Sequence, residues 1–208
     1  MQTRSRRAVI LVFDGVEVLD VAAPVQALAL AGRNWNFRAF RIELVAEHPG
    51  PINSLNQLRL EAPHALSACA PADVVVVPGG YGARQLIEQP ELLQNLARIA
   101  TGAELVAGIG WGVAVLAAAG LVGDRRVAVP PRARETLAGL APDATLDPSH
   151  GVVLSGALLT AAAGGAALDL GITIIERTFG PRLAAMVRNE LFLEDPNGST
   201  YFRIVSTD

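Results

Sequence analysis

The stretch from Glu104 to Val122 constrains the fold of this chain more than any other, because it reads as a strand, a glycine turn and a helix. It carries no charged residue after Glu104. Sharp turns of this kind lift one side chain clear of a sheet and aim a helix N-terminus at it, so they commonly carry a nucleophile. At this turn the chain reads Gly110-Trp111-Gly112. The sequence therefore predicts the architecture of an active site whose turn holds a glycine in place of a nucleophile.

Strand and helix signals alternate along the whole chain. Unbroken apolar runs and β-branched residues predict strands over 8–13, 41–46, 58–61, 73–77, 104–109, 127–129, 152–154, 158–160 and 201–205. Helices are predicted over 24–31, 90–101, 132–140, 165–178 and 181–191, from apolar periodicity, early prolines and terminal glycines. The strand over 58–61 is expected beside the strand over 41–46. This alternation predicts an α/β fold, a three-layer α/β/α sandwich with a mostly parallel, Rossmann-like (flavodoxin-like) sheet.

Length and composition indicate one folded domain over residues 1–193, followed by a C-terminal extension over 194–208 with a possible edge strand. Of the 208 residues 51% are hydrophobic, which excludes intrinsic disorder. Two uncharged stretches, 105–122 and 151–168, are interrupted by glycines, which favours buried strand-turn-helix units over membrane spans. The apolar run over 8–13 is short and is read as a first strand, not a signal peptide. We expect a cytoplasmic protein with no membrane contact.

The charged residues exclude several chemistries. A net charge of −3 argues against nucleic acid as a partner of this chain alone. All 17 basic residues are arginine, so no lysine is present for Schiff-base or P-loop chemistry. The arginines at 125, 126, 132 and 134 form either an anion patch or a solvated helix edge.

Metal and thiol chemistry also find little support. The histidines and the single cysteine, Cys69, show no metal-ligand spacing, so neither a metal nor another cofactor is expected. Cys69 precedes the strand over 73–77, at the end opposite the expected binding edge, and is predicted to be a small buried hydrophobe.

Candidate site residues gather where predicted strands end, the edge at which open α/β sheets bind ligands. Gly79 and Gly80 follow the strand over 73–77, and their backbone N–H groups are expected to approach a ligand. Asp20 is either a pocket carboxylate capable of acid–base chemistry or a helix-start residue satisfied by backbone N–H groups. Trp111 either fills the pocket or forms one wall of it, and Tyr81 is either a second aromatic wall or an exposed loop residue.

Four stretches in this order resemble the ThiJ/PfpI family of the class I glutamine amidotransferase-like superfamily. They read V-I-L-V-F-D-G-V-E-V-L-D, D-V-V-V-V-P-G-G-Y-G, the turn at Gly110 running into L-A-A-A-G-L, and L-D-L-G-I-T-I-I-E-R-T-F-G. The resemblance covers about residues 8–193. It is greatest to the branch that holds isonitrile hydratase and the sensor domains of AraC-type regulators.

The resemblance carries expectations about the site. It implies a Rossmann-like sheet and usually a homodimer, with a reactive cysteine at the turn. That cysteine position falls on Gly110, and a histidine position falls on Pro130. The family's acidic residue corresponds to Asp20, and its backbone donors correspond to Gly79 and Gly80. The resemblance therefore predicts that the carboxylate and the donors are kept while the cysteine and histidine are gone.

Three functions follow as hypotheses. The first is a catalytically degenerate protein with a regulatory or sensing role, which binds a small metabolite among Asp20, Gly79-Gly80-Tyr81 and Gly110-Trp111-Gly112. After Leu193 too few residues remain for the DNA-binding segment of the AraC-type regulators, so regulation is expected through a partner or as a stand-alone binder. The second is a cysteine-independent hydratase or hydrolase, isonitrile hydratase-like or amidase-like, with Asp20 as its acid or base. The third is a structural homodimer that holds a partner through its dimer surface or through the strand over 201–205.

Overall fold

The valine run Val74–Val77 forms β6, an inner strand with four fully buried side chains. It lies between two other strands of the main sheet, as a run that is apolar on both faces requires. The structure is a computed structural model and describes residues 4–35, 39–148, 151–191 and 204–206.

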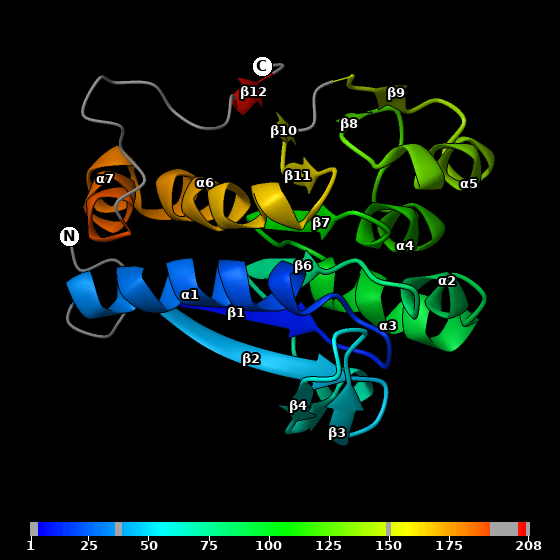
Figure 1. Cartoon of the computed structure of the whole chain (residues 1–208), viewed down its shortest axis with the longest axis horizontal. Coiled ribbons are helices and arrows are strands. Elements are labelled where there is room, and N and C mark those ends of the chain that lie inside the picture. Colours follow the sequence, from blue (N-terminus) through cyan, green and yellow to red (C-terminus); the bar gives the residue numbers. More distant parts are fainter. Residues whose placement is uncertain (1–3, 36–38, 149–150, 192–203, 207–208) are drawn as a thin grey trace.

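The main sheet is eight-stranded, in the order β12-β10-β11-β7-β6-β1-β2-β5. All neighbours are parallel except β10 and β11, which form an antiparallel hairpin. Besides β6, its strands are β1 (Arg6–Leu11), β2 (Phe40–Ala46), β5 (His64–Ala65), β7 (Leu105–Ile109), β10 (Val152–Ser155), β11 (Leu158–Ala161) and β12 (Ile204–Ser206). The predicted mostly parallel sheet is confirmed (Figure 1).

Two small sheets accompany the main one. β3 (Gly50–Asn53) pairs antiparallel with β4 (Arg59–Ala62), and β8 (Arg126–Val127) pairs parallel with β9 (Thr145–Leu146). The strand expected over 58–61 forms as β4 and contacts β2, but it pairs with β3 in a separate sheet. A short turn folds β4 back onto β3, and β5 takes the edge of β2 instead.

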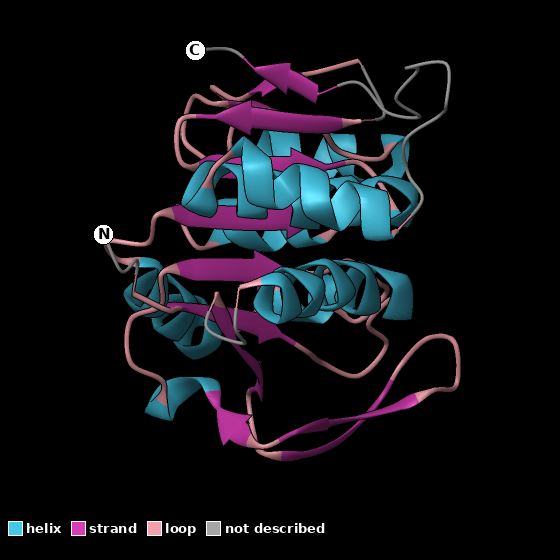
Figure 2. Cartoon of the chain, turned by 90° about the vertical axis from the view of Figure 1, so that its left-hand side faces the viewer, coloured by secondary structure: helices cyan, strands magenta, loops and turns pink. Residues whose placement is uncertain are grey.

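Helices cover both faces of the sheet, which completes the three layers (Figure 2). Helices α1, α6 and α7 pack on one another, whereas α3 and α4 pack on β6 and β7 from the other side. The helices are α1 (Val18–Asn34), α2 (Ala83–Leu86), α3 (Pro90–Ala100), α4 (Gly112–Ala118), α5 (Arg134–Leu140), α6 (Ala167–Phe179) and α7 (Pro181–Glu190). Short 3₁₀ turns are η1 (Leu66–Ala68), η2 (Pro131–Ala133) and η3 (Gly164–Ala166).

Helix α1 is longer than the predicted helix over 24–31. It starts at Val18 and runs through Pro24, whereas the sequence predicts a helix that begins at Pro24. A proline inside a helix removes one intrahelical hydrogen bond. Packing against α6 offsets that loss, because the backbone of Pro24 lies against Gly171 of α6. The longer helix places Asp20 in its first turn.

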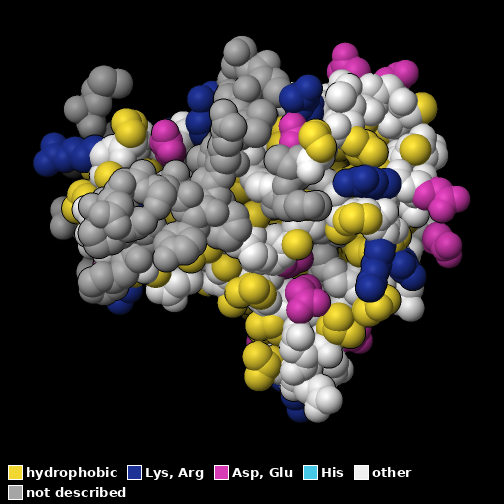
Figure 3. Space-filling model, turned by 45° about the horizontal axis from the view of Figure 1, so that its top comes forward, with side chains coloured by type: hydrophobic (Ala, Val, Ile, Leu, Met, Phe, Trp, Pro, Cys, Tyr) yellow, Lys and Arg dark blue, Asp and Glu magenta, His cyan; other side chains and the backbone are white. Residues whose placement is uncertain are grey.

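The C-terminal segment adds one parallel strand at an end of the main sheet, where β12 pairs with β10. The strand predicted over 201–205 overlaps it, although residues 201–203 lie outside the described residues. No described helix is long and apolar enough to span a bilayer. On the face in Figure 3, basic and acidic side chains are interspersed with hydrophobic ones.

The α1–α6 contact gives a test of the packing. A β-carbon at Gly171 would lie 2.9 Å from both Ala27 Cβ and Pro24 Cα, so Gly171→Ala should destabilise the protein by about 1–3 kcal/mol through overpacking. At Gly32, also in α1, a β-carbon would have nothing within 4 Å. Gly32→Ala should therefore stabilise by about 0.4–1 kcal/mol. Urea unfolding of both variants checks the pair, and equal effects would contradict the close contact.

Candidate functional site

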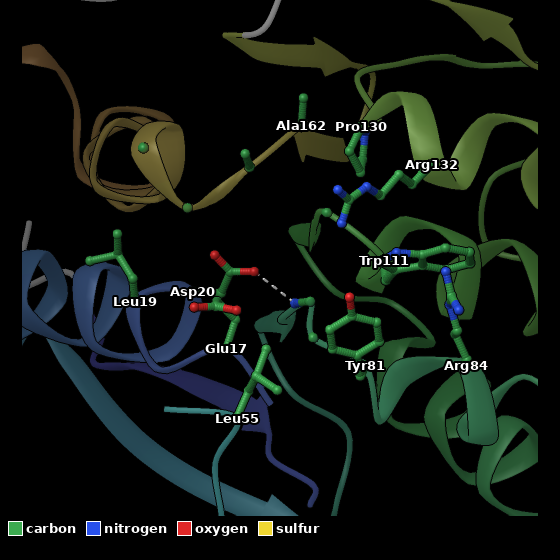
Figure 4. Close-up of a pocket in the computed structure, with 16 residues that line it drawn as sticks. Glu17, Leu19, Asp20, Leu55, Tyr81, Arg84, Trp111, Pro130, Arg132 and Ala162 are labelled. Atoms are coloured by element: carbon green, nitrogen blue, oxygen red, sulfur yellow. Dashed lines mark hydrogen bonds between the residues drawn. The ribbon is translucent and has the colours of Figure 1, made fainter. Parts of the chain in front are cut away.

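The turns that follow β6, β7 and β11 meet the first turn of α1 around a cavity of about 440 Å³ (Figure 4). This is the carboxyl edge of the parallel strands, the expected binding edge of an open α/β sheet. The cavity brings together six of the seven predicted ligand-binding residues: Asp20, Gly79, Gly80, Tyr81, Gly110 and Trp111.

Asp20 lies on the α1 side of this cavity. The residue is only 3% exposed. Its Oδ2 accepts a hydrogen bond from the Gly79 backbone N–H at 2.9 Å, and its Oδ1 has no hydrogen-bond partner among the described residues. An ionised carboxylate offers about four acceptor positions, so Asp20 is left largely unsatisfied. Buried polar groups in this state mark places where a ligand or water completes the bonding.

Burial changes the acidity of Asp20. Desolvation disfavours the charged form and raises the pKa of this carboxyl from 3.8 to about 6, against the opposing effect of the Gly79 hydrogen bond. The nearby charge of Glu17 raises this pKa further. Asp20 therefore exchanges its proton close to neutral pH, within the range that general acid–base chemistry uses.

Three glycines surround the Asp20 carboxylate. A β-carbon at Gly79 would lie 2.8 Å from Oδ2, and one at Gly164 would lie 2.8 Å from Oδ1. Side chains at these two positions would therefore collide with the carboxylate. Gly110 differs, since a β-carbon there would have no neighbour nearer than 3.8 Å. The space beside Gly110 is open and adjoins the cavity, and its φ of +56° suits a glycine.

The backbone donors are arranged differently from the expectation. The Gly79 N–H bonds to Asp20, so it serves the carboxylate and not a ligand. Gly112, the seventh predicted ligand-binding residue, does not line the cavity. A β-carbon there would lie 2.0 Å from the Val77 carbonyl oxygen, so Gly112 allows α4 to start against the end of β6.

Trp111 forms a wall of the cavity and does not fill it. The Arg84 guanidinium lies over the indole at 4.4 Å from the ring centroid, and over the Tyr81 ring at 5.6 Å. Cation–π contacts of this kind hold the three side chains together on the side of the cavity opposite Asp20 (Figure 4). Tyr81, which is 56% exposed, lies at the rim.

Two arginines of the cavity wall, Arg84 and Arg132, were not among the predicted site residues. Arg132 follows Pro130, which also lines the cavity, and its guanidinium points toward the cavity in Figure 4. It is the one member of the predicted arginine patch that lines the cavity, whereas Arg126 pairs with Asp147 at 3.3 Å. A sequence signal existed for Arg84. It stands three residues after the predicted site residue Tyr81, and in a helix residues at this spacing lie on the same face.

The wall lacks the usual nucleophiles. No Cys, Ser, Thr, Lys or His is among the described residues that line it, and its ionisable groups are Glu17, Asp20, Tyr81, Arg84 and Arg132. Cys69 is buried elsewhere, where its thiol donates to the Ala65 carbonyl oxygen at 3.3 Å. Within the described ranges no cluster of three His, Cys, Asp or Glu could hold a metal ion. The arrangement thus offers an unsatisfied carboxylate on one side of the cavity, with two arginines and two aromatic rings on the other side.

Comparison with known proteins places this geometry in context. The model of the DJ-1/PfpI family matches residues 6–177. The chain is 26% identical over 183 residues to the HTH-type transcriptional regulator CdhR of Pseudomonas aeruginosa. The aligned region covers 88% of this chain and 54% of the regulator. It is 28% identical over 181 residues to the isonitrile hydratase of Pseudomonas putida. Here the aligned region covers 87% of this chain and 75% of the hydratase. This chain therefore spans about half the length of the regulator.

The fold has close counterparts among solved structures. A THiJ/PfpI family protein from Pseudomonas syringae superposes with a TM-score of 0.82 at 22% identity, over 92% of this chain and 77% of that one. At this identity the likeness concerns the fold.

The raised pKa of Asp20 predicts a dependence of stability on pH. The folded state binds this proton more tightly than the unfolded chain, so the stability that Asp20 contributes is complete below about pH 3.8 and is lost as pH rises through about 6. Asp20→Asn keeps an acceptor for the Gly79 N–H and removes the ionisation. Between about pH 4 and pH 8 the native protein should lose about 2 kcal/mol relative to this variant. Urea unfolding at both pH values measures the difference, and parallel pH profiles would contradict the buried carboxylate.

Proposed function

The chain belongs to the DJ-1/PfpI family, and from that premise we propose that it binds a small metabolite beside Asp20 and Gly110 without converting it, as a sensing or regulatory protein. The observation that carries this proposal is the cavity itself. It has a volume suited to a small molecule, a buried unsatisfied carboxylate, and open space where the turn after β7 presents Gly110.

The described lining lacks the family's cysteine and any other thiol, which supports binding over turnover. Glycine at the turn offers no attacking atom, and the described lining contains no thiol, aliphatic hydroxyl, amine or imidazole. Thiols, aliphatic hydroxyls, amines and imidazoles are among the groups that form covalent intermediates in nucleophilic catalysis. A ligand that enters this cavity meets charged and aromatic groups that recognise it and hold it.

The names of the relatives bear on regulation and on catalysis. One is named a transcriptional regulator and another an isonitrile hydratase, so the family includes proteins named for regulation and for chemistry on small molecules. A cavity that has charged and aromatic side chains to bind a ligand, and no thiol, aliphatic hydroxyl, amine or imidazole in its described lining, fits a regulatory protein better than an enzyme.

Ligand binding predicts a ligand-dependent rise in thermal stability. The screen uses small carboxylates, amides, amines and aldehydes. A ligand at one hundred times its Kd should raise the free energy of unfolding by about 2.7 kcal/mol, which raises Tm by several degrees. Gly165 lines the cavity and a β-carbon there has nothing within 4 Å, so Gly165→Phe should place a ring at the cavity and abolish the rise.

Gly139→Phe is the matched control for this screen. Gly139 is exposed in α5, has equally open surroundings and does not line the cavity. It should respond to ligands as the native protein does. A screen in which no compound stabilises the native protein, or in which every rise survives Gly165→Phe, would contradict the proposed function.

A second candidate function is hydration or hydrolysis without a cysteine, and the acidity of Asp20 favours it. A carboxyl with a pKa of about 6 is a competent general base for an attacking water at neutral pH. Isonitriles and amides are the substrates to assay, given the named hydratase relative.

This second function makes a separate prediction. Turnover of an isonitrile or amide should follow the ionisation of Asp20, rising with pH through about 6, and should fall about a hundredfold or more in Asp20→Asn. Rate measurements on the native protein and this variant decide the matter. Unchanged turnover in Asp20→Asn removes Asp20 as the base.

A further inference from the structure

Resting on the proposed function, we propose that the ligand carries a head group with N–H donors, which enters the open space beside Gly110, and a carboxylate at its other end, which binds Arg84 and Arg132. The head group is a primary amide or an ammonium, because both present several N–H donors.

The protein around the head-group site presents acceptors. The β-carbon position at Gly110 lies 3.8 Å from Asp20 Oδ2 and 3.8 Å from the Ala162 carbonyl oxygen. Oδ2 accepts only the Gly79 N–H among the described residues, so it can accept a second donor. A group that bears two N–H bonds and sits in this space can donate to both oxygens. A hydrocarbon or a second carboxylate in the same place leaves the buried carboxylate unsatisfied or repels it.

The opposite wall presents cations. Arg84 and Arg132 form no ion pair within the described parts of the chain, whereas the arginines at the other end of the sheet do, with Arg7 on Glu43 at 2.6 Å and Arg6 on Glu104 at 2.8 Å. Trp111 and Tyr81 hold Arg84 in place at the wall. Guanidinium groups recognise carboxylates through paired N–H donors, so two unpaired arginines at one wall suit an anionic tail.

The two walls together select a polarised ligand. Glu17 and Asp20 lie on one side and the two arginines on the other, as Figure 4 shows, and the charges do not neutralise one another by contact. A ligand with donors at one end and a carboxylate at the other matches this order. A dicarboxylate places one anion against Asp20, and a diamide leaves the arginines without an anion.

A matched series of probes tests this assignment by calorimetric titration. Glutaramate and δ-aminovalerate carry a carboxylate with an amide or an ammonium head, while glutarate and glutaramide carry two identical ends on a similar skeleton. Each is also tested with one methylene fewer, to vary the span. The Kd of the best amide or ammonium acid should be about tenfold or more below the Kd of glutarate and glutaramide. The head group that gives the lower Kd is the one that donates to Asp20.

Two glycine variants separate the head-group site from general stability. Gly110→Ala puts a methyl group in the open space and should raise the Kd of the best probe about tenfold or more. Gly156→Ala is its control, because Gly156 has a similar φ of +59°, open surroundings and no place in the cavity. Both variants should lose similar stability, because each places an alanine in the left-handed region, and only the first should lose binding. Arg132→Gln should weaken the carboxylate probes and leave glutaramide unchanged.

The outcomes distinguish this inference from the proposed function. If a ligand from the wider screen binds through the cavity but is unaffected by Gly110→Ala, the head-group assignment is wrong and the proposed function stands. Absence of binding by every amide and ammonium acid, while another ligand binds, also overturns the assignment. If no compound of any class stabilises the native protein, both the head-group assignment and the proposed function are wrong.

Discussion

The hydrogen bond from the Gly79 N–H to the Asp20 carboxylate is the contact on which the site depends. At 2.9 Å it joins the first turn of α1 to the turn after β6, two segments far apart in the sequence. Around it, the turns at Gly110 and Gly164 come close enough that only a residue without a side chain fits at two of the three glycines. The cavity is the space that this close approach leaves at the carboxyl edge of the sheet.

This contact leaves the carboxylate in an unfavourable state. A buried charge with one hydrogen bond is costly, and Asp20 reduces that cost by holding its proton more tightly than an exposed aspartate does. Groups in such a state cluster at functional sites because a bound ligand or a reaction relieves them. Other charged groups in the fold show the contrast: at the amino end of the sheet Glu43 is paired with two arginines, and its pKa is lowered. Asp20 therefore differs from Glu43, whose carboxylate is paired.

Much of the fold and part of the cavity could be predicted from the sequence. The valine run of β6 and the glycine turn after β7 are local signals, and parallel strands bring their carboxyl ends to one edge. That logic placed Gly79 and Gly110 at one edge, and the family resemblance added Asp20 to them. The start of α1 was misjudged because Pro24 is tolerated through packing on α6, a contact distant in sequence.

The place of Arg132 in the cavity wall also depends on packing between segments distant in sequence. The segment after β8 is held against β11, where the Ala128 N–H donates to Thr160 Oγ1, and this contact brings Pro130 and Arg132 to the cavity. Gly112 was assigned to the ligand since it flanks Trp111, but the carbonyl of Val77 behind it explains that glycine by packing alone. Local patterns thus identified the edge of the sheet, and tertiary packing determined which side chains face the cavity.

The most direct test of this account is the pKa of Asp20 itself, measured by carbon NMR of the labelled carboxyl with Asp20→Asn as the assignment control. In the free protein we expect a pKa of about 6, which falls when an amide or ammonium acid binds and donates to the carboxylate. A free-protein pKa near 3.8 would contradict the account, because it would mean that the carboxylate is already hydrated or paired. A pKa that no stabilising ligand moves would place the ligand elsewhere.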